Sequence, residues 1–395
     1  MKPPRDWKAA TVADICEMRN GHGFGPDDWD VTGLPIIRIQ NLNGGKKFDY
    51  YSGVPEKRWL VEPGQLLFAW AGTRGVSFGP TIWSGPVGVL NQHIFKIEAI
   101  EGIDSEWLYW ALRHVTDRIE AQAHGFKATL VHVKKSDIDR QIVAIPSQAE
   151  QHRIAQILST WDQAIATTGR LLANIRQQKD VLANSLLTGR RRLAGYTNWT
   201  NKKVADLIVE SRVRGSGGDV AKKITVKLYG RGVVGKSEKR LGSESTQYYR
   251  RAAGQFIYSK LDFLNGAFGQ IPETLDGYES TLDLPAFDFL PGIDARWFLH
   301  FVSREDFYLG HLGLANGGRK ARRVNPLDLL RVTILVPELA EQKAIANVLG
   351  AAQAEINNFT KQLSLLREQK TALMSQLLTG KRRVLLPAPF VERAA

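Results

Sequence analysis

The chain has 395 residues, of which 43% are hydrophobic, and its formal net charge is +13 with a sequence pI near 9.7. This length allows two or three domains of ordinary size. No apolar run approaches the ~18 residues that a membrane span needs, and the N-terminus lacks the apolar core of a secretory signal. The single cysteine, Cys16, excludes an internal disulfide framework, so we expect a cytoplasmic protein.

The positive charge is concentrated in part of the sequence. Residues 202–251 contain 13 Lys and Arg against 5 Asp and Glu, so this eighth of the chain carries +8 of the +13. A second basic stretch, GGRKARRVN, lies at 317–325. Glycines and aromatic residues interrupt the basic residues, a mixture suited to loops that contact phosphates and base edges. We therefore expect a nucleic acid partner; the alternative is a basic, solvated face without such a partner.

The first 145 residues are typical of a mixed α/β region. The β-rich runs LPIIRIQNL (34–42) and QLLFAW (65–70) predict strands separated by glycine turns. DSEWLYWALRHV begins a helix that we predict over 104–121.

A long amphipathic helix is predicted next. Ser147 and Glu150 form an S-x-x-E capping box at its start, and Gly189 is a natural left-handed stop. Between them, apolar residues alternate at spacings of four and three, which is the pattern of a coiled-coil seam. The seam residues, interrupted by one lysine, are Ile154, Leu158, Trp161, Ile165, Leu172, Ile175, Lys179, Leu182 and Leu186.

The second half of the chain repeats the first. PSQAEQHRIAQIL at 146–158 recurs as PELAEQKAIANVL at 337–349, and over 48 aligned residues from these starts the copies share 19. The preceding regions match more weakly; KITVKLYG (223–230) predicts a strand, and DARWFLHFV (294–302) is the equivalent of the earlier helix. The second seam is in the same register and consists of Ile345, Leu349, Ile356, Phe359, Leu363, Leu366, Lys370, Leu373 and Leu377.

These patterns predict an α+β fold built by tandem internal duplication with pseudo-twofold symmetry. A single amphipathic helix cannot bury its own apolar stripe, so we expect the two long helices to pair as an antiparallel coiled coil. Pairing between two chains is the alternative. The predicted segments are a variable region at 1–145, a helix at 146–194, a second variable region at 195–336, a helix at 337–384 and a C-terminal tail at 385–395.

A short motif raises the possibility of a nucleotide site. GRGVVGKS at 230–237 fits the phosphate-binding loop G-x-x-x-x-G-K-[ST]. That loop must be followed by a long helix, but EKRLGSE after Ser237 is polar and contains Gly242. A glycine turn that carries Arg231 and Lys236 toward DNA explains the same residues. The histidines and Cys16 show no metal-ligand spacing, so we predict no catalytic site and no metal site.

With this duplicated arrangement the sequence resembles the specificity (S) subunits of type I restriction–modification systems. The resemblance covers almost the whole chain and depends on a helix entered through P-x-x-x-EQ and closed by LLTG, present twice. The residues that carry it are Pro146, Glu150, Gln151 and Leu186–Gly189, and again Pro337, Glu341, Gln342 and Leu377–Gly380.

The resemblance implies a non-catalytic chain with no cofactor of its own. In that family two target-recognition domains each read half of a bipartite site in double-stranded DNA. The helices space the domains and dock two methyltransferase subunits, which bind S-adenosylmethionine; separate restriction subunits use ATP. The competing hypotheses from other classes are a phosphate-loop NTPase and a coiled-coil adaptor without sequence-specific DNA binding.

Polar and basic residues in predicted loops of both variable regions are the candidates for DNA contact. In the first region they are Arg38, Gln40, Asn41, Lys46, Lys47, Arg74 and Lys127. In the second they are Arg212, Arg214, Lys227, Arg231, Lys236, Arg319, Lys320 and Arg322.

Overall fold

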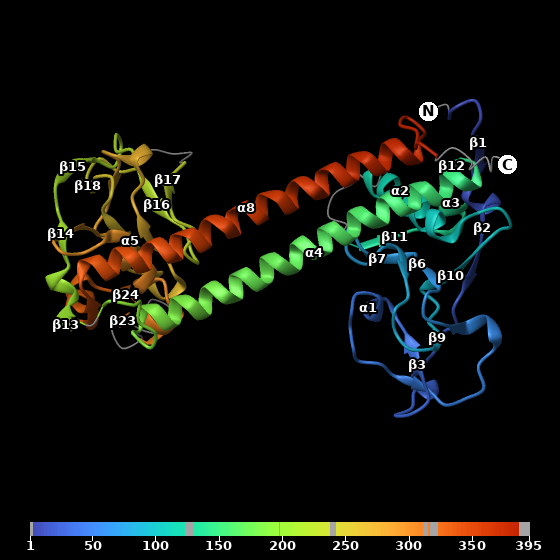
Figure 1. Cartoon of the computed structure of the whole chain (residues 1–395), viewed down its shortest axis with the longest axis horizontal. Helices are drawn as coiled ribbons and strands as arrows, with labels where there is room; N and C mark the ends of the chain where they lie inside the picture. Colours follow the sequence, from blue (N-terminus) through green and yellow to red (C-terminus); the bar gives the residue numbers. More distant parts are fainter. Residues whose placement is uncertain are drawn as a thin grey trace, which may run out of the picture. The chain divides into compact units, whose positions relative to one another are not determined.

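Two helices of 40 residues each, α4 (Gln148–Leu187) and α8 (Leu339–Leu378), are the longest elements of the chain. The computed structural model describes residues 3–122, 130–196, 198–237, 242–310, 315–316 and 323–386. The chain divides into unit 1, residues 1–169 and 361–395, and unit 2, residues 170–360. Each unit combines helices with several small sheets, as Figure 1 shows, which confirms the prediction of a mixed α and β fold.

Unit 1 contains a four-stranded antiparallel sheet in the order β2-β10-β6-β8 and a separate antiparallel pair, β1-β12. A second four-stranded sheet has the order β4-β3-β9-β5, and β11 pairs with β7. The strands are β1 (Lys8–Thr11), β2 (Cys16–Asn20), β3 (Leu34–Ile37), β4 (Tyr50–Tyr51), β5 (Leu60–Val61), β6 (Leu66–Ala69), β7 (Ala71–Thr73), β8 (Gly79–Ile82), β9 (Gly88–Leu90), β10 (Ile94–Ala99), β11 (Leu130–His132) and β12 (Ile142–Ile145). Its shorter helices are η1 (Val12–Asp14), η2 (Pro26–Asp28), α1 (Ile39–Leu42), η3 (Lys57–Trp59), α2 (Ser105–Gln122) and α3 (Lys135–Asp139).

The main core of unit 1 lies where α2 packs on the first sheet. Trp107 and Leu112 of α2 are buried against Phe68 of β6. The start of α4 and the end of α8 enter the same core, through residues such as Ile154 and Leu377. The predicted helix at 104–121 is thus confirmed, shifted by one residue.

Unit 2 repeats the strand order of unit 1 in its central sheet. That sheet has the order β14-β22-β19-β20, and β13 pairs with β25 as β1 pairs with β12. Smaller sheets have the orders β15-β18-β21, β16-β17 and β23-β24. The strands are β13 (Trp199–Lys203), β14 (Ile208–Ser211), β15 (Arg214–Gly217), β16 (Ile224–Val226), β17 (Val233–Gly235), β18 (Gln247–Arg250), β19 (Phe256–Tyr258), β20 (Phe268–Gln270), β21 (Glu279–Ser280), β22 (Ala286–Phe289), β23 (Ala315–Asn316), β24 (Arg323–Val324) and β25 (Thr333–Pro337).

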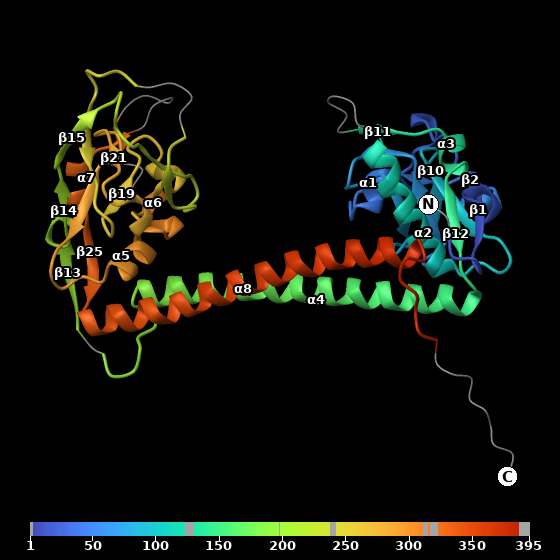
Figure 2. The ribbon, with the colours of Figure 1, turned by 90° about the horizontal axis from the view of Figure 1, so that it is seen from above.

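A short helix covers the central sheet of unit 2 as α2 does in unit 1. The helices of this unit besides the long ones are η4 (Val204–Asp206), η5 (Phe263–Asn265), η6 (Glu273–Leu275), α5 (Ala295–Val302), α6 (Glu305–Gly310) and α7 (Pro326–Leu330). Figure 1 and Figure 2 both show α5 beside the first turns of α8. Trp297 and Phe298 of α5 are buried with Ile345 and Leu349 of α8 in the main core.

The long helices begin and end where the sequence predicts. The Ser147 amide donates to Glu150 Oε2 at 3.3 Å, and the Glu150 amide donates to Ser147 Oγ at 3.4 Å, which completes the capping box. Gly189 and Gly380, just past the two helix ends, have φ angles of +74° and +70°. Glycine adopts this left-handed conformation without a steric penalty, so it terminates both helices.

The predicted seam residues of α4 and α8 are all buried or half-buried. In unit 1 the Lys370 ammonium donates to Asp162 Oδ1 at 2.5 Å and lies 4.5 Å from the Trp110 ring centroid. In unit 2 Lys179 donates to Gln353 Oε1 at 2.6 Å, and burial lowers its pKa. Each lysine at a seam position therefore has a polar partner on the other helix.

The glutamine of each EQ pair joins its helix to the loop before α2 or α5. Gln151 Oε1 accepts from the Asp104 amide at 2.8 Å, and its Nε2 donates to the carbonyls of Pro146 and Gly102 at 3.1 and 3.3 Å. In unit 2, Gln342 accepts from the Asp294 amide at 2.8 Å and donates to the carbonyls of Pro337 and Gly292 at 2.9 and 3.2 Å. The buried amide thus satisfies backbone groups that would otherwise lack partners.

The glutamate of each EQ pair is buried and shared by an arginine and a tryptophan. Glu150 accepts from Trp7 Nε1 at 3.2 Å and from Arg383 at 2.6 and 2.9 Å. Glu341 accepts from Trp199 Nε1 at 2.7 Å and from Arg192 at 2.9 and 3.0 Å. Each arginine also lies over its tryptophan ring, at 5.4 Å in unit 1 and 5.0 Å in unit 2. We call these two groups the carboxylate anchors.

Two predicted strands are shorter than expected. The run 34–42 forms a strand only to Ile37, because the buried Asn41 side chain accepts from the Arg38 amide at 2.9 Å and turns the chain into α1. The run 223–230 forms a strand only over Ile224–Val226, because a turn follows in which Tyr229 has a φ of +59°. In both places local turn chemistry overrides the apolar pattern.

Replacing Arg192 with alanine leaves the Glu341 carboxylate, whose side chain is 0% exposed, with only the Trp199 donor. We expect the free energy of unfolding to fall by about 2–4 kcal/mol, because the loss of one partner leaves a buried charge poorly compensated. Urea unfolding of Arg192→Ala against the parent measures this. Lys202→Ala, on an exposed position of the nearby strand β13, is the control and should stay within about 0.5 kcal/mol. Equal stability of Arg192→Ala and the control would contradict the prediction.

Acid should weaken unit 2 through His300 on α5. Burial lowers the pKa of His300 to about 4, and repulsion by Lys179 and Arg296 adds to the effect. The unfolded imidazole binds a proton that the folded one does not, so stability is full above about pH 6.5 and falls as pH decreases toward 4. Between pH 7 and pH 5 the free energy of unfolding should therefore decrease by about 1–2 kcal/mol less in His300→Gln than in the parent. Urea unfolding at both pH values tests this, with exposed His93→Gln as control; identical losses in parent and His300→Gln would refute it.

Candidate nucleic-acid interface

In unit 1 five of the predicted DNA-contact residues, Arg38, Gln40, Asn41, Lys46 and Lys47, lie in or directly beside the turn formed by α1, whereas Arg74 lies between β7 and β8. Arg38 is half-buried, pairs with Asp49, and its guanidinium carbon lies 4.8 Å from the centroid of the Trp29 ring. Trp29 is 46% exposed. An exposed indole beside an arginine is a surface on which a base or sugar can stack. Trp29 could not be predicted from the sequence as part of this surface, because its position beside Arg38 depends on the fold.

The other candidates of unit 1 divide into exposed and buried side chains. Gln40, Lys46, Lys47 and Arg74 are exposed. Asn41 is only 5% exposed, and its amide donates to the carbonyls of residues 45 and 47 at 3.0 and 2.9 Å. Asn41 therefore shapes the loop that carries the lysines and does not present its own side chain to a ligand. Lys127 lies outside the described residues.

In unit 2 the motif GRGVVGKS forms the second half of a β-hairpin. Val226 of β16 pairs with Val233 of β17, and residues 227–232 connect them. Lys227, Arg231 and Lys236 are exposed. The expectation of a glycine turn is confirmed, since strand β17 occupies 233–235, residues that a phosphate-binding loop would use to surround the phosphate with backbone amides.

The remaining candidates of unit 2 lie at or directly before strand β15, or beyond the described residues. Arg212 is exposed and pairs with Glu210 at 2.8 Å. Arg214, on β15, donates to Gln247 Oε1 of β18 at 2.9 Å. Arg319, Lys320 and Arg322 lie outside the described residues.

Part of the positive charge at 202–251 is internal. Arg251 is 1% exposed and donates to Ser280 Oγ at 2.8 Å and to the carbonyls of Ser211 and Leu284 at 2.7 and 3.3 Å. Burial lowers its pKa to about 10. Lys223 is 6% exposed. These two cations support the small sheets of the unit, so the charge available to a ligand is smaller than the sequence count indicates.

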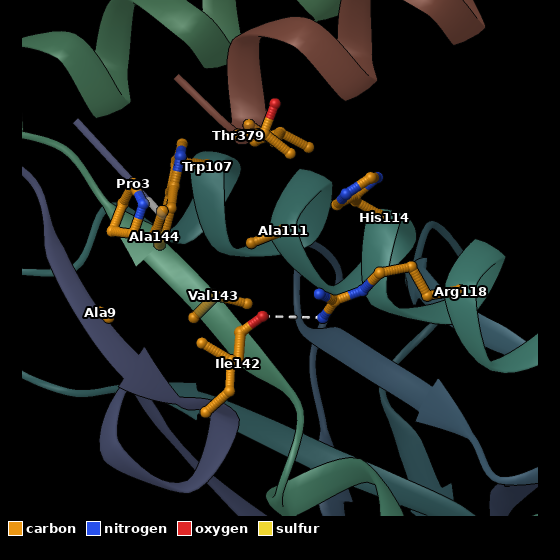
Figure 3. A pocket seen from close by; sticks show the side chains of 11 residues that line it. Pro3, Ala9, Trp107, Ala111, His114, Arg118, Ile142, Val143, Ala144 and Thr379 are labelled. Atoms are coloured by element: carbon orange, nitrogen blue, oxygen red, sulfur yellow. Dashed lines mark hydrogen bonds between the residues drawn. The ribbon is translucent and has the colours of Figure 1, made fainter. Parts of the chain in front are cut away.

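A cavity of about 280 Å³ lies in unit 1 between α2, β12 and the end of α8. Figure 3 shows Trp107, Ala111 and Arg118 on its walls, with Arg118 donating to a β12 carbonyl at 2.8 Å. In unit 2 the equivalent of Ala111 is Phe301, whose ring centroid lies 5.2 Å from that of Trp297, the equivalent of Trp107. The cavity is thus lined by a small side chain at a position where unit 2 has a phenylalanine.

Two further features bear on the class of site. Across the described ranges, no cluster of three or more His, Cys, Asp or Glu side chains is placed to hold a metal ion. None of the helices that the structure describes combines the length and apolar content needed to cross a membrane.

Comparison with known proteins finds relatives of one kind. A family model described as "Type I restriction modification DNA specificity domain" matches residues 4–177. The specificity subunit of the type I restriction enzyme EcoBI from Escherichia coli is 30% identical over 43% of this chain, a match that spans 35% of that relative. The MjaVIII specificity subunit from Methanocaldococcus jannaschii is 21% identical over 97% of this chain and 95% of its own.

Solved structures share the fold over the whole length. The type I restriction–modification S subunit from M. genitalium aligns over 96% of this chain and 98% of its own, with a TM-score of 0.55 and 15% identity. A chain from a structure concerned with complex assembly and conformational transition of the type I system aligns over 97% and 100%, with a TM-score of 0.61 and 14% identity. Residues 4–177 thus match the DNA specificity domain of type I restriction–modification systems, and the chain is similar to specificity subunits over nearly its whole length.

Proposed function

We propose that this chain is the non-catalytic subunit that gives a type I restriction–modification complex its DNA sequence specificity. Recognition domains 1–145 and 195–336 would each read one half of an asymmetric bipartite site in double-stranded DNA. One observation carries the proposal: both units have the same central strand order and the same carboxylate anchor, yet they expose different residues. Two domains with the same fold and different surface residues are suited to two half-sites of different sequence.

We propose further that the two halves arose by duplication and that the helices 146–194 and 337–384 form an antiparallel coiled coil. The pairs Asp162–Lys370 and Lys179–Gln353 support this direction, because higher residue numbers on α4 meet lower ones on α8. Both pairs join the helices of one chain, as intramolecular pairing requires. Coiled-coil spacing of the domains would set the gap between the half-sites.

The catalytic functions are assigned to partners. Two methyltransferase subunits would dock on the helices and bind S-adenosylmethionine, and restriction subunits, where present, would use ATP. The structure aligned with the highest TM-score given above concerns complex assembly, which supports a chain that works as part of a complex. We place this work in the cytoplasm, where such a complex meets cellular DNA.

Sequencing of methylated adenines after expression with cognate methyltransferase subunits tests the proposal directly. We expect one motif made of two different half-sites separated by a fixed gap of unspecified bases. Methylation without sequence preference would favour the coiled-coil adaptor hypothesis. A motif without a gap would contradict the proposal that two separate domains each recognise one half-site.

Four residues inserted after Ile175 should change the gap without changing either half-site. The insertion lengthens α4 by ~6 Å and rotates it by ~40°, so part of the apolar stripe is kept. At ~3.4 Å per base pair the gap should grow by about two pairs if the added length is passed fully to the DNA. The methylated motif of the variant is the measurement.

A loss of methylation in the insertion variant would not decide the question, because the shifted seam also weakens helix packing. A four-residue insertion in the tail after Leu385 is the control and should leave the motif unchanged. An altered half-site with an unaltered gap would show that the helices do not space the domains.

The isolated chain should not bind ATP. GRGVVGKS forms a hairpin turn followed by strand β17, so the amides that would surround a phosphate at the N-terminus of a helix are paired in a sheet. Titration calorimetry with MgATP should show no binding for the parent chain or for Lys236→Ala. Micromolar binding that Lys236→Ala abolishes would restore the NTPase hypothesis.

A further inference from the structure

We infer that the β16–β17 hairpin tip reads a base within one half-site, with Arg231 contacting the base and Tyr229 orienting Arg231. The inference rests on the proposed function, since it assumes that the second recognition domain binds DNA. It assigns direct readout to a motif that otherwise resembles a phosphate-binding loop.

The first observation is a strained and exposed aromatic residue. Tyr229 is the one non-glycine residue with a positive φ, +59°, in the described part of the chain. Its side chain is 72% exposed, so little apolar burial compensates for the strain. A bulky side chain in the left-handed region is uncommon because its Cβ crowds the following carbonyl. Strained residues of this kind concentrate at functional sites.

The second observation is that the tip is fixed in place. The amides of Tyr229 and Gly230 donate to the carbonyls of Asn265 and Gly266 at 2.9 and 2.8 Å. A Cβ on Gly266 would lie 3.2 Å from the Tyr229 Cα, so the two turns are in close contact. The hairpin base is buried too, because Val226 belongs to an apolar cluster in unit 2. Backbone contacts of this kind fix the position from which the tip projects its side chains.

The third observation is the chemistry at the tip. The guanidinium carbon of Arg231 lies 5.8 Å from the centroid of the Tyr229 ring, within the range of a cation–π contact. Lys227 on the same turn is exposed and adds positive charge. A two-stranded ribbon fits the major groove of B-DNA, where a planar guanidinium donates two hydrogen bonds to O6 and N7 of guanine. The expected target of Arg231 is therefore a guanine.

A phosphate contact by the same arginine is the rival interpretation, and substitutions separate the two. Arg231→Ala removes both charge and shape, whereas Arg231→Lys keeps the charge and loses the two-pronged geometry. If Arg231 contacts a base, both substitutions should reduce discrimination at that base pair. A phosphate contact should tolerate lysine and should affect all DNA sequences alike.

The experiment uses the chain assembled with its methyltransferase subunits and a duplex that carries the methylated motif of the parent complex. Competition binding with duplexes changed at one base pair each gives the discrimination at every position. For Arg231→Ala and Arg231→Lys we expect roughly 5- to 150-fold weaker binding to the native duplex and lost discrimination at a single G·C pair. The other half-site should keep its full discrimination. Lys202→Ala, which removes an exposed charge of β13, is the matched control and should keep every position.

Tyr229→Gly is a second variant, chosen because it should not destabilise the hairpin. Glycine adopts a φ of +59° freely, so this variant should unfold at a temperature no lower than the parent. We expect it to lose discrimination at the same G·C pair as Arg231→Ala. Unchanged discrimination in Tyr229→Gly, or a uniform loss of affinity in Arg231→Ala, would overturn the inference.

The proposed function and the inference fail in different ways. If the parent complex shows no preference for its motif over unrelated duplexes, specific DNA recognition is wrong, and the inference with it. If the parent discriminates at both half-sites while the Arg231 variants do so equally well, only the role of the hairpin tip is wrong.

Discussion

A buried carboxylate in the first turn of each long helix holds the rest of the fold in place. Glu150 and Glu341 are 5% and 0% exposed, and a charge at such depth is tolerated only when donors surround it. In each unit these donors are an arginine that follows the far end of the other helix and a tryptophan at the start of the first strand or directly before it. One carboxylate thus links two helices and a domain, and the neighbouring glutamine joins the same helix to α2 or α5.

This arrangement explains why the EQ pair, and not the apolar seam, is the part of the repeat that is easiest to recognise. Apolar seam positions accept several residue types of similar volume, so the copies differ there, as in Trp161 against Ala352. A buried carboxylate that accepts from guanidinium and indole groups has no substitute of the same charge and length. The sequence did predict the capping box of Ser147 and Glu150 and the stops at Gly189 and Gly380, because these depend on local spacing.

What could not be predicted depends on contacts between distant parts of the chain. Trp7 and Arg383 are 376 positions apart, and nothing local indicates that they meet at Glu150. Counting charges also misjudged the basic region, because Arg251 and Lys223 are buried. Strand lengths were overestimated at 34–42 and 223–230, where an asparagine cap and a left-handed tyrosine turn the chain. Each of these is a case in which turn chemistry or burial, invisible in a linear pattern, decides the structure.

The two carboxylate anchors differ in when they can form during synthesis. In unit 2 the tryptophan and arginine, Trp199 and Arg192, lie in one short connecting segment, and every residue of that unit falls within 170–360. Unit 1 needs Trp7 from the beginning of the chain and Arg383 from near its end. On the ribosome, unit 2 can complete its anchor while unit 1 still waits for the last turns of α8. Until then Glu150 lacks its cation, so the first domain to be translated is the last to be finished.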